Sequence, residues 1–277
     1  MNNGFGITKH AFISPIPYLQ YVPSDSRVHL MLVHLMDDER YNQFYRDKQR
    51  RGDFIIIDNS AFEFGEPASL ATIRDKCIKA QIVPDIVVAP DYPGQPWSKT
   101  YEAAITADNE FIDYFDPEKT QLMCVPQSER NDYVGWLECY DLMIGNIGNC
   151  GMIGMSILGI PTAFKEWAGT EDVSTIRSAV TAYLIQEELA SKNHKHHYLG
   201  CHSPRELLMM KYQGLAWSND SSTAIWHGIH NVEFDASPSG LKNGKIPVPV
   251  DFELPCVLGN EPIHNNIEWI RSLLQDK

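Results

Sequence analysis

The chain has 277 residues, of which 43% are hydrophobic and 21% are charged. This composition is ordinary for a globular protein with a real core, and the length suits one barrel-sized domain or two smaller ones. The net charge of −13 argues against a general affinity for nucleic acid, because phosphates need a basic surface.

The first 27 residues contain Pro15, Pro17 and Pro23, so we expect them to be irregular. Beyond them, buried apolar runs predict strands at 28–36, 54–58, 85–91, 121–127, 151–158, 197–201 and 215–220. The segments between these runs predict helices at 37–51, 69–81, 99–115, 130–144, 173–191, 204–213 and 263–274.

This alternation of strands and helices predicts a parallel sheet covered by helices. An open, doubly wound sheet would carry a glycine-rich phosphate loop after its first strand, and this chain has none. Polar residues also follow many of the predicted strands, whereas an open sheet gathers them at one switch point. We therefore expect an α/β fold in which residues 1–277 form a single (β/α)8 barrel domain. Residues 228–277 are expected to be an irregular tail with a terminal helix.

The six cysteines show no CxxC pairing and no short zinc spacing, which favours a reducing compartment. The N-terminus lacks a basic and then apolar secretion signal. No apolar stretch approaches the roughly 18 to 20 residues of a membrane span. We expect a cytoplasmic protein that does not enter a membrane.

Three basic clusters leave a local path for a polynucleotide open. They are Arg46 to Arg51, the KNHKHH segment at 192–197, and Lys242 with Lys245. Clusters of this kind are more often solvated faces than binding sites.

The segment 53–65, DFIIIDNSAFEFG, organises the rest of the chain. A β-branched run suited to a strand buried on both faces ends in Asp58, Asn59 and Ser60, with Phe62 beyond. An Asx turn that closes the strand is the simplest interpretation. The same pattern recurs along the chain, however, and this favours a binding site.

Polar residues end several predicted strands, namely Asp58, Asp91, Gln127, Ser156 and Asp220. In a barrel they all point into one mouth. A metal site, a glycosidase-like pair of carboxylates and a site for an amide-rich ligand are all compatible with this set. Metal sites in barrels usually recruit histidine, but His34, His202 and His227 form no HxH pair. Paired carboxylates suit chemistry at an anomeric carbon, while Asp and Gln match the edge of a purine and Phe62 can stack on its face.

Five segments, taken together, resemble the tRNA-guanine transglycosylases over residues 54–225. IDNSAF resembles their TDSGxF segment, APD at 89–91 resembles FDE, VPQS at 125–128 resembles VQGG, and IGMSILG at 153–159 resembles IGGLAVG. YLGCHSPREL at 198–207 followed by NDSST at 219–223 resembles YLMGVGxPxxL followed by FDSAS. The variant is most similar to the smaller, phage DpdA-type DNA-guanine transglycosylases, which insert 7-deazaguanines into DNA.

The resemblance implies a role for each matching residue. Asp220 would be the nucleophile at deoxyribose C1′, and Asp58 would be the general acid and base. The base-binding residues would be Phe62, Asp91, Gln127, Gly154, Met155 and Ser156. His227, Lys242 and Lys245 are candidate nucleic-acid contacts. The partners implied are DNA and a free base such as 7-cyano-7-deazaguanine. The target base would have to leave the helix stack to enter the pocket. The resemblance also implies a phage protein that acts in the host cytoplasm and protects DNA from restriction.

The chain also departs from the family pattern. The tRNA enzymes carry a CxCxxC zinc site with a distant histidine, whereas this chain has only Cys256 in that region, so we expect no metal there and no cofactor. Met155 replaces a glycine, SSTAIWHG replaces an arginine-bearing segment, and Asn219 competes with Asp220 for the nucleophile position. Action on tRNA, a non-catalytic binding paralogue, a metal-dependent hydrolase and a homodimer all stay open.

Overall fold

The computed structural model describes residues 9–201, 203–236, 241, 254–255 and 261–274. Its strands are β1 (Lys9–Phe12), β2 (Val28–Leu32), β3 (Phe54–Asp58), β4 (Ile86–Val88), β5 (Gln121–Cys124), β6 (Cys150–Gly154), β7 (Lys195–Tyr198) and β8 (Ala216–Ser221). They form one eight-stranded sheet in the order β1-β8-β7-β6-β5-β4-β3-β2, and each neighbouring pair is parallel.

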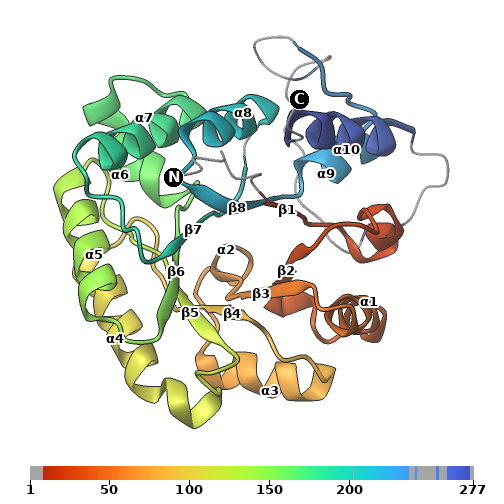
Figure 1. The fold of residues 1–277 in the computed structure, drawn as a ribbon, viewed down its shortest axis with the longest axis horizontal. Helices are drawn as coiled ribbons and strands as arrows, with labels where there is room; N and C mark the ends of the chain where they lie inside the picture. The colour runs from red at the N-terminus through yellow and green to blue at the C-terminus, as the bar shows by residue number, and fades with distance from the viewer. Residues whose placement is uncertain (1–8, 202, 237–240, 242–253, 256–260, 275–277) are drawn as a thin grey trace, which may run out of the picture.

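The sheet curls until its edge strands β1 and β2 come together, and the strands form a ring in Figure 1. The fold is therefore a nearly closed (β/α)8 barrel, which confirms the predicted fold class. Because all strands run in the same direction, their carboxyl ends share one face of the barrel.

The helices are α1 (Glu39–Arg50), α2 (Ala61–Phe64), α3 (Leu70–Ala80), α4 (Trp97–Tyr114), α5 (Tyr133–Asn146), α6 (Gly159–Ala168), α7 (Val173–Gln186), α8 (Pro204–Gln213), α9 (Thr223–Ile229) and α10 (Glu261–Leu274). Most of them surround the ring of strands (Figure 1). Side chains of Asp38, Ser69, Asp132, Asp172 and Ser203 cap the first turns of α1, α3, α5, α7 and α8. None of the helices that the structure describes is long and apolar enough to cross a membrane.

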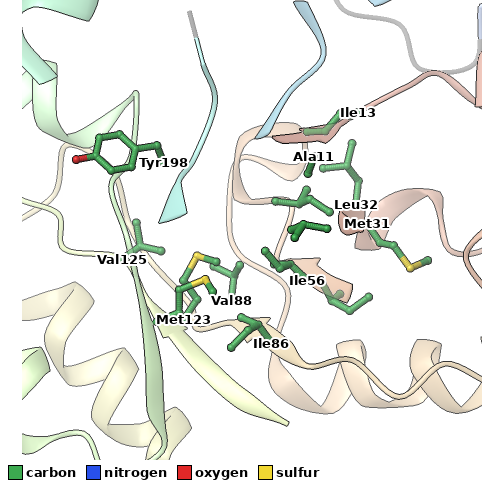
Figure 2. Packing of buried hydrophobic residues seen from close by; sticks show 14 of the residues in the cluster. Ala11, Ile13, Met31, Leu32, Ile56, Ile86, Val88, Met123, Val125 and Tyr198 are labelled. Carbon is green, nitrogen blue, oxygen red and sulfur yellow. The ribbon is translucent and has the colours of Figure 1, made fainter. Parts of the chain in front are cut away.

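Apolar strand residues pack the barrel, as Figure 2 shows for Ile56, Val88 and Met123 among others. At the amino end, the rings of Phe54 on β3 and Trp217 on β8 meet edge to face, with centroids 5.0 Å apart. These strands are not neighbours in the sheet. Their contact therefore closes the amino end of the barrel, and the carboxyl end is left for the site.

The structure corrects several sequence expectations. The irregular segment predicted over residues 1–27 is wrong for strand β1 and for the 3-10 helix Ile16–Tyr21. Helices α6 and α9 were not predicted, and the strand predicted at 28–36 ends at Leu32. Pro161 lies in the first turn of α6, where a missing N–H removes no helical hydrogen bond. Most of the predicted tail, including Cys256, lies outside the described residues.

Candidate active site

A pocket of about 300 Å³ opens at the carboxyl ends of the strands, and we call it the mouth pocket. Its polar lining is Asp58, Asn59, Glu63, Asp91, Ser156, Asp220, Ser221, Ser222 and Thr223, and its apolar lining includes Phe62, Leu158 and Leu199. It brings together both predicted catalytic residues and three of the predicted base-binding residues. None of the described residues that line it is a lysine, arginine or histidine.

Asp58 enters this pocket because β3 ends in two successive Asx turns. Oδ2 of Asp58 accepts the N–H of Ser60 at 2.8 Å, and Oδ1 of Asn59 accepts the N–H of Ala61 at 2.9 Å. Ser60, between them, has a φ of 52°, which is left-handed and unusual for a residue other than glycine. The Asx turn is therefore confirmed, and the same segment brings Asp58 and Asn59 to the wall of the mouth pocket.

The pKa values of Asp58 and Glu63 are both raised by desolvation and by the neighbouring acids. Desolvation raises the pKa of Asp58 well above its usual range, and the charges of Glu63, Asp91 and Asp220 add to the effect. Desolvation, followed by the charge of Asp220, also raises the pKa of Glu63. A protonated carboxyl group is thus available at Asp58 at higher pH than on an exposed aspartate.

Asp220 lies in a different environment. Its Oδ1 accepts hydrogen bonds from Nε2 of His197 at 2.9 Å and from the N–H of Gly200 at 3.1 Å. The other ring nitrogen of His197 is 2.6 Å from Oγ of Ser218. Because a carboxylate only accepts, Nε2 carries a proton and donates it to Asp220. Among the described residues, Oδ2 of Asp220 takes part in no hydrogen bond, and Asp220 lines the mouth pocket.

The neighbour of Asp220 does not share this position. Asn219 is fully buried, does not line the mouth pocket, and accepts a hydrogen bond from His10. Burial lowers the pKa of His10 to about 4, so this imidazole is neutral near pH 7. The geometry therefore selects Asp220 over Asn219 as the residue that can reach a ligand.

Asp91 lines the pocket with both carboxylate oxygens already oriented. Nδ2 of Asn59 donates to Oδ1 at 2.8 Å, and Nε2 of Gln127 donates to Oδ2 at 2.7 Å. Burial raises the pKa of Asp91. Gln127 is fully buried behind Asp91 and is not part of the pocket wall. It positions Asp91, and a Cβ at Gly159 would displace the Gln127 amide that holds Asp91.

The remaining predicted base-binding residues are divided between the pocket and the core. Phe62 lines the pocket and is 67% exposed, so one face of its ring is accessible. Ser156 also lines the pocket, but its Oγ accepts the N–H groups of Leu158 and Gly159. Gly154 and Met155 do not line the pocket; a Cβ at Gly154 would approach side chains of the barrel interior, so its packing, and not a ligand, requires glycine.

Arg177 on α7 is fully buried and fixes the wall beside Asp220. It pairs with Glu206 on α8, with Nε 2.6 Å from Oε1. Its other nitrogens donate to the backbone carbonyl groups of Met155, Leu199 and Gly200. The ends of β6 and β7 are thereby held together, and with them the Gly200 N–H that contacts Asp220.

Of the three predicted nucleic-acid contacts, the structure describes only His227. His227 on α9 is not part of its lining, and its Nδ1 hydrogen-bonds the carbonyl group of Thr223. Lys242 and Lys245 lie outside the described residues. Within the described ranges, no three His, Cys, Asp or Glu side chains group closely enough to hold a metal ion.

Sequence reasoning missed Glu63, His197 and Arg177. Glu63 belongs to the quoted 53–65 segment, but its position depends on the single turn of α2. His197 was seen only as part of a basic cluster, although alternation along β7 and β8 places it beside Ser218 and Asp220.

The arrangement offers two carboxyl groups in unlike environments around a small, partly aromatic cavity. Such a pair can transfer a proton and attack a carbon centre in one step. A search against models of known protein families and a search of curated proteins found no match to this chain.

Proposed function

We propose that the protein is a base-exchange transglycosylase that replaces guanine in DNA with a 7-deazaguanine such as 7-cyano-7-deazaguanine. The observation that carries the proposal is the contrast between Asp58 and Asp220 in one pocket. Asp58 is half-buried and its raised pKa favours the protonated form, whereas Oδ1 of Asp220 is held by two donors. Carboxyl groups separated in this way can divide acid and nucleophile roles between them.

In the first half-reaction, Oδ2 of Asp220 attacks C1′ of the target nucleotide. A C1′–O bond forms while the C1′–N9 bond breaks, and the electron pair of that bond leaves with guanine. Asp58 donates its proton to the departing base, which leaves as neutral guanine. The result is a glycosyl ester on Asp220 and a carboxylate at Asp58.

In the second half-reaction, N9 of the incoming 7-deazaguanine attacks C1′ and displaces the Asp220 carboxylate. The N9 proton passes to Asp58, which returns to its starting state. Two displacements at one carbon retain the configuration at C1′. Water in place of the base would instead give hydrolysis and an abasic site.

The pocket suits a nucleobase. A volume of about 300 Å³ is at the lower end of the range for small-molecule sites, which fits one base. Asp91 presents acceptor oxygens to the N–H groups of a guanine-like edge, and the exposed ring of Phe62 can stack on the base. The described lining is acidic and contains no cation, which disfavours a phosphate inside the pocket.

The choice of DNA as the polymer rests on the resemblance of five segments to the phage-type DNA-guanine transglycosylases. That resemblance also supports a role in phage DNA modification. The alternative polymer is tRNA, and the same two carboxylates would perform the same chemistry on it.

A base-exchange assay tests the proposal. DNA or tRNA labelled in guanine is incubated with the protein and 7-cyano-7-deazaguanine, and released label and incorporated deazaguanine are both measured. Asp220→Ala and Asp58→Asn are run beside Asp116→Asn, an aspartate before β5 at the other end of the barrel.

We expect the wild type and Asp116→Asn to exchange guanine in DNA, and Asp220→Ala to release none. Release from tRNA alone would assign the polymer to the alternative. Release without incorporation would identify an N-glycoside hydrolase, and no release from either polymer by folded protein would refute the proposal.

A further inference from the structure

A second surface pocket, which we call the side pocket, adjoins the mouth pocket. It has a volume of about 400 Å³, and both pockets are lined by Ile157 and Leu158. Its other lining residues are Arg130, Pro161, Thr162, Lys165, Glu171, Val173 and Ile176. Arg130 follows β5 and Lys165 belongs to α6, which starts after β6, so the side pocket lies at the same end of the barrel.

The charges of the two pockets are opposite in kind. Asp58, Glu63, Asp91 and Asp220 line the mouth pocket without a described cation. The side pocket carries Arg130 and Lys165 and a single acid. On a chain with a net charge of −13, a polyanion needs local cations to approach an acidic mouth. The side pocket supplies them at the rim.

The loop that carries Arg130 is fixed to the barrel. The N–H of Asn131 donates to the carbonyl group of Thr162 at 3.0 Å, and its side chain contacts Glu166 at 2.6 Å. Oγ of Ser128 donates to the carbonyl group of Asp132 at 2.7 Å and closes the loop. Within the described part of the chain, no hydrogen bond or ion pair engages the Arg130 guanidinium, so a rigid loop presents an exposed cation.

Glu171 forms an ion pair with Lys165 in the structure. Its Oε1 lies 2.6 Å from Nζ of Lys165, and its side chain is 83% exposed. Lys165 first, and Arg130 more weakly, hold the pKa of Glu171 below its usual range. An anionic oxygen thus already lies against Lys165, and exposed ion pairs of this kind are weak enough to be displaced.

We propose, on the basis of the proposed function, that Arg130 and Lys165 bind a phosphodiester group of the strand that carries the target nucleotide. A base inside the mouth pocket keeps its sugar at the rim, and the phosphates bonded to that sugar must lie beside the rim. The side pocket meets this requirement across the Ile157–Leu158 wall. The phosphate displaces Glu171, which acts as an internal competitor.

The test measures binding of a fluorescent single-stranded DNA oligonucleotide to the full chain by anisotropy at several salt concentrations. Arg130→Gln and Lys165→Gln should each weaken binding and reduce the slope of log K against log salt by about 1. Glu171→Gln should tighten binding, which a folding defect does not produce. Affinity for free 7-cyano-7-deazaguanine should stay unchanged in all three variants.

Another pocket provides a matched control. It has a volume of about 370 Å³ and is lined by Arg74, Lys119 and Asp116 among others, before β4 and β5 at the opposite end of the barrel. Arg74→Gln and Lys119→Gln should leave DNA binding unchanged. Equal losses in the control variants, or unchanged affinity in Arg130→Gln, Lys165→Gln and Glu171→Gln, would overturn the proposal.

The outcome is independent of base exchange. DNA binding that depends on Arg130, Lys165 and Glu171 supports the phosphate site even when no guanine is released. Active exchange with wild-type DNA affinity in these variants overturns the phosphate site and leaves the proposed function intact. Binding of inorganic phosphate to the side pocket without any DNA binding would also overturn the assignment to a polynucleotide.

Discussion

His197 and Asp220 form a hydrogen bond of 2.9 Å between Nε2 and Oδ1 in the interior of the barrel mouth. Both side chains are at least 95% buried, so water does not replace this donor. The bond fixes one carboxylate oxygen of a side chain that lines the mouth pocket. His197 is therefore a positioning residue for the proposed nucleophile.

His197→Phe should lower kcat of base exchange about tenfold to a hundredfold, because a hydrogen bond to a charged group contributes about 1.5–3 kcal/mol. His197→Gln retains an amide donor and should lose less. The measurement is kcat and KM for both variants, with KM for DNA unchanged. Equal rates in both variants and the wild type would show that the bond does not position Asp220.

The raised pKa of Asp58 predicts how the rate of base exchange depends on pH at the alkaline end of the profile. Its pKa is raised by desolvation and by the neighbouring acids, and the first half-reaction needs its protonated form. The rate should therefore fall as pH rises through the raised pKa of Asp58. Asp58→Asn should lose about 10²–10⁴-fold in rate, and its residual rate should not show this fall.

The same pKa shift makes a prediction for stability. Between the unfolded pKa of aspartate and the raised folded pKa of Asp58, the folded state binds more protons, so stability falls as pH rises through that window. Asp58→Asn removes this ionisation and keeps an acceptor for the Ser60 N–H. It should unfold at a higher temperature than the wild type at pH 8 and differ less at pH 4. A lower Tm for the variant at both pH values would contradict the burial argument.

Of the residues that do not line the mouth pocket, we expect Arg177 to contribute most to the stability of the fold. Arg177→Met removes the ion-pair partner of the buried Glu206 carboxylate, and breaking a buried pair in this way typically costs about 3–5 kcal/mol. It also removes the hydrogen bonds that Arg177 donates to the carbonyl groups of Met155, Leu199 and Gly200. The free energy of unfolding in urea measures the loss, and adding Glu206→Leu should recover part of it. A loss below about 1 kcal/mol would mean that the pair does not hold the wall.

The sequence was most informative where one segment determines its own structure. Strand β3 ends at Asp58 as predicted, because a run of isoleucines and the following Asx turn specify it locally. Helix α8 begins after Ser203 and ends before Gly214, as its cap residues predict. The parallel barrel follows from the alternation of such segments, and with it the convergence of Asp58, Asp91 and Asp220.

Features that depend on residues far apart in the chain could not be predicted from the sequence in this way. Arg177 resembles a surface residue of an amphipathic helix, and its burial depends on Glu206 and three carbonyl groups far along the chain. Gln127 was predicted to contact the ligand, but the space beside Gly159 directs it behind Asp91. β1 is four residues long with prolines nearby, and it is a strand because β8 pairs with it.

Variants of Phe62 and Phe64 can distinguish an effect on base stacking from an effect on folding. Both rings are exposed, 67% and 52%, and both belong to the single turn of α2, but only Phe62 lines the mouth pocket. Phe62→Ala should weaken binding of 7-cyano-7-deazaguanine by about 1–3 kcal/mol, the usual contribution of base stacking. Surface truncations outside contacts change stability by about 0.5 kcal/mol or less, so its Tm should stay close to that of the wild type. Phe64→Ala is the matched control, and we expect it to bind the base normally in the same calorimetric titration. Equal affinity in the two variants would mean that the base does not stack on Phe62.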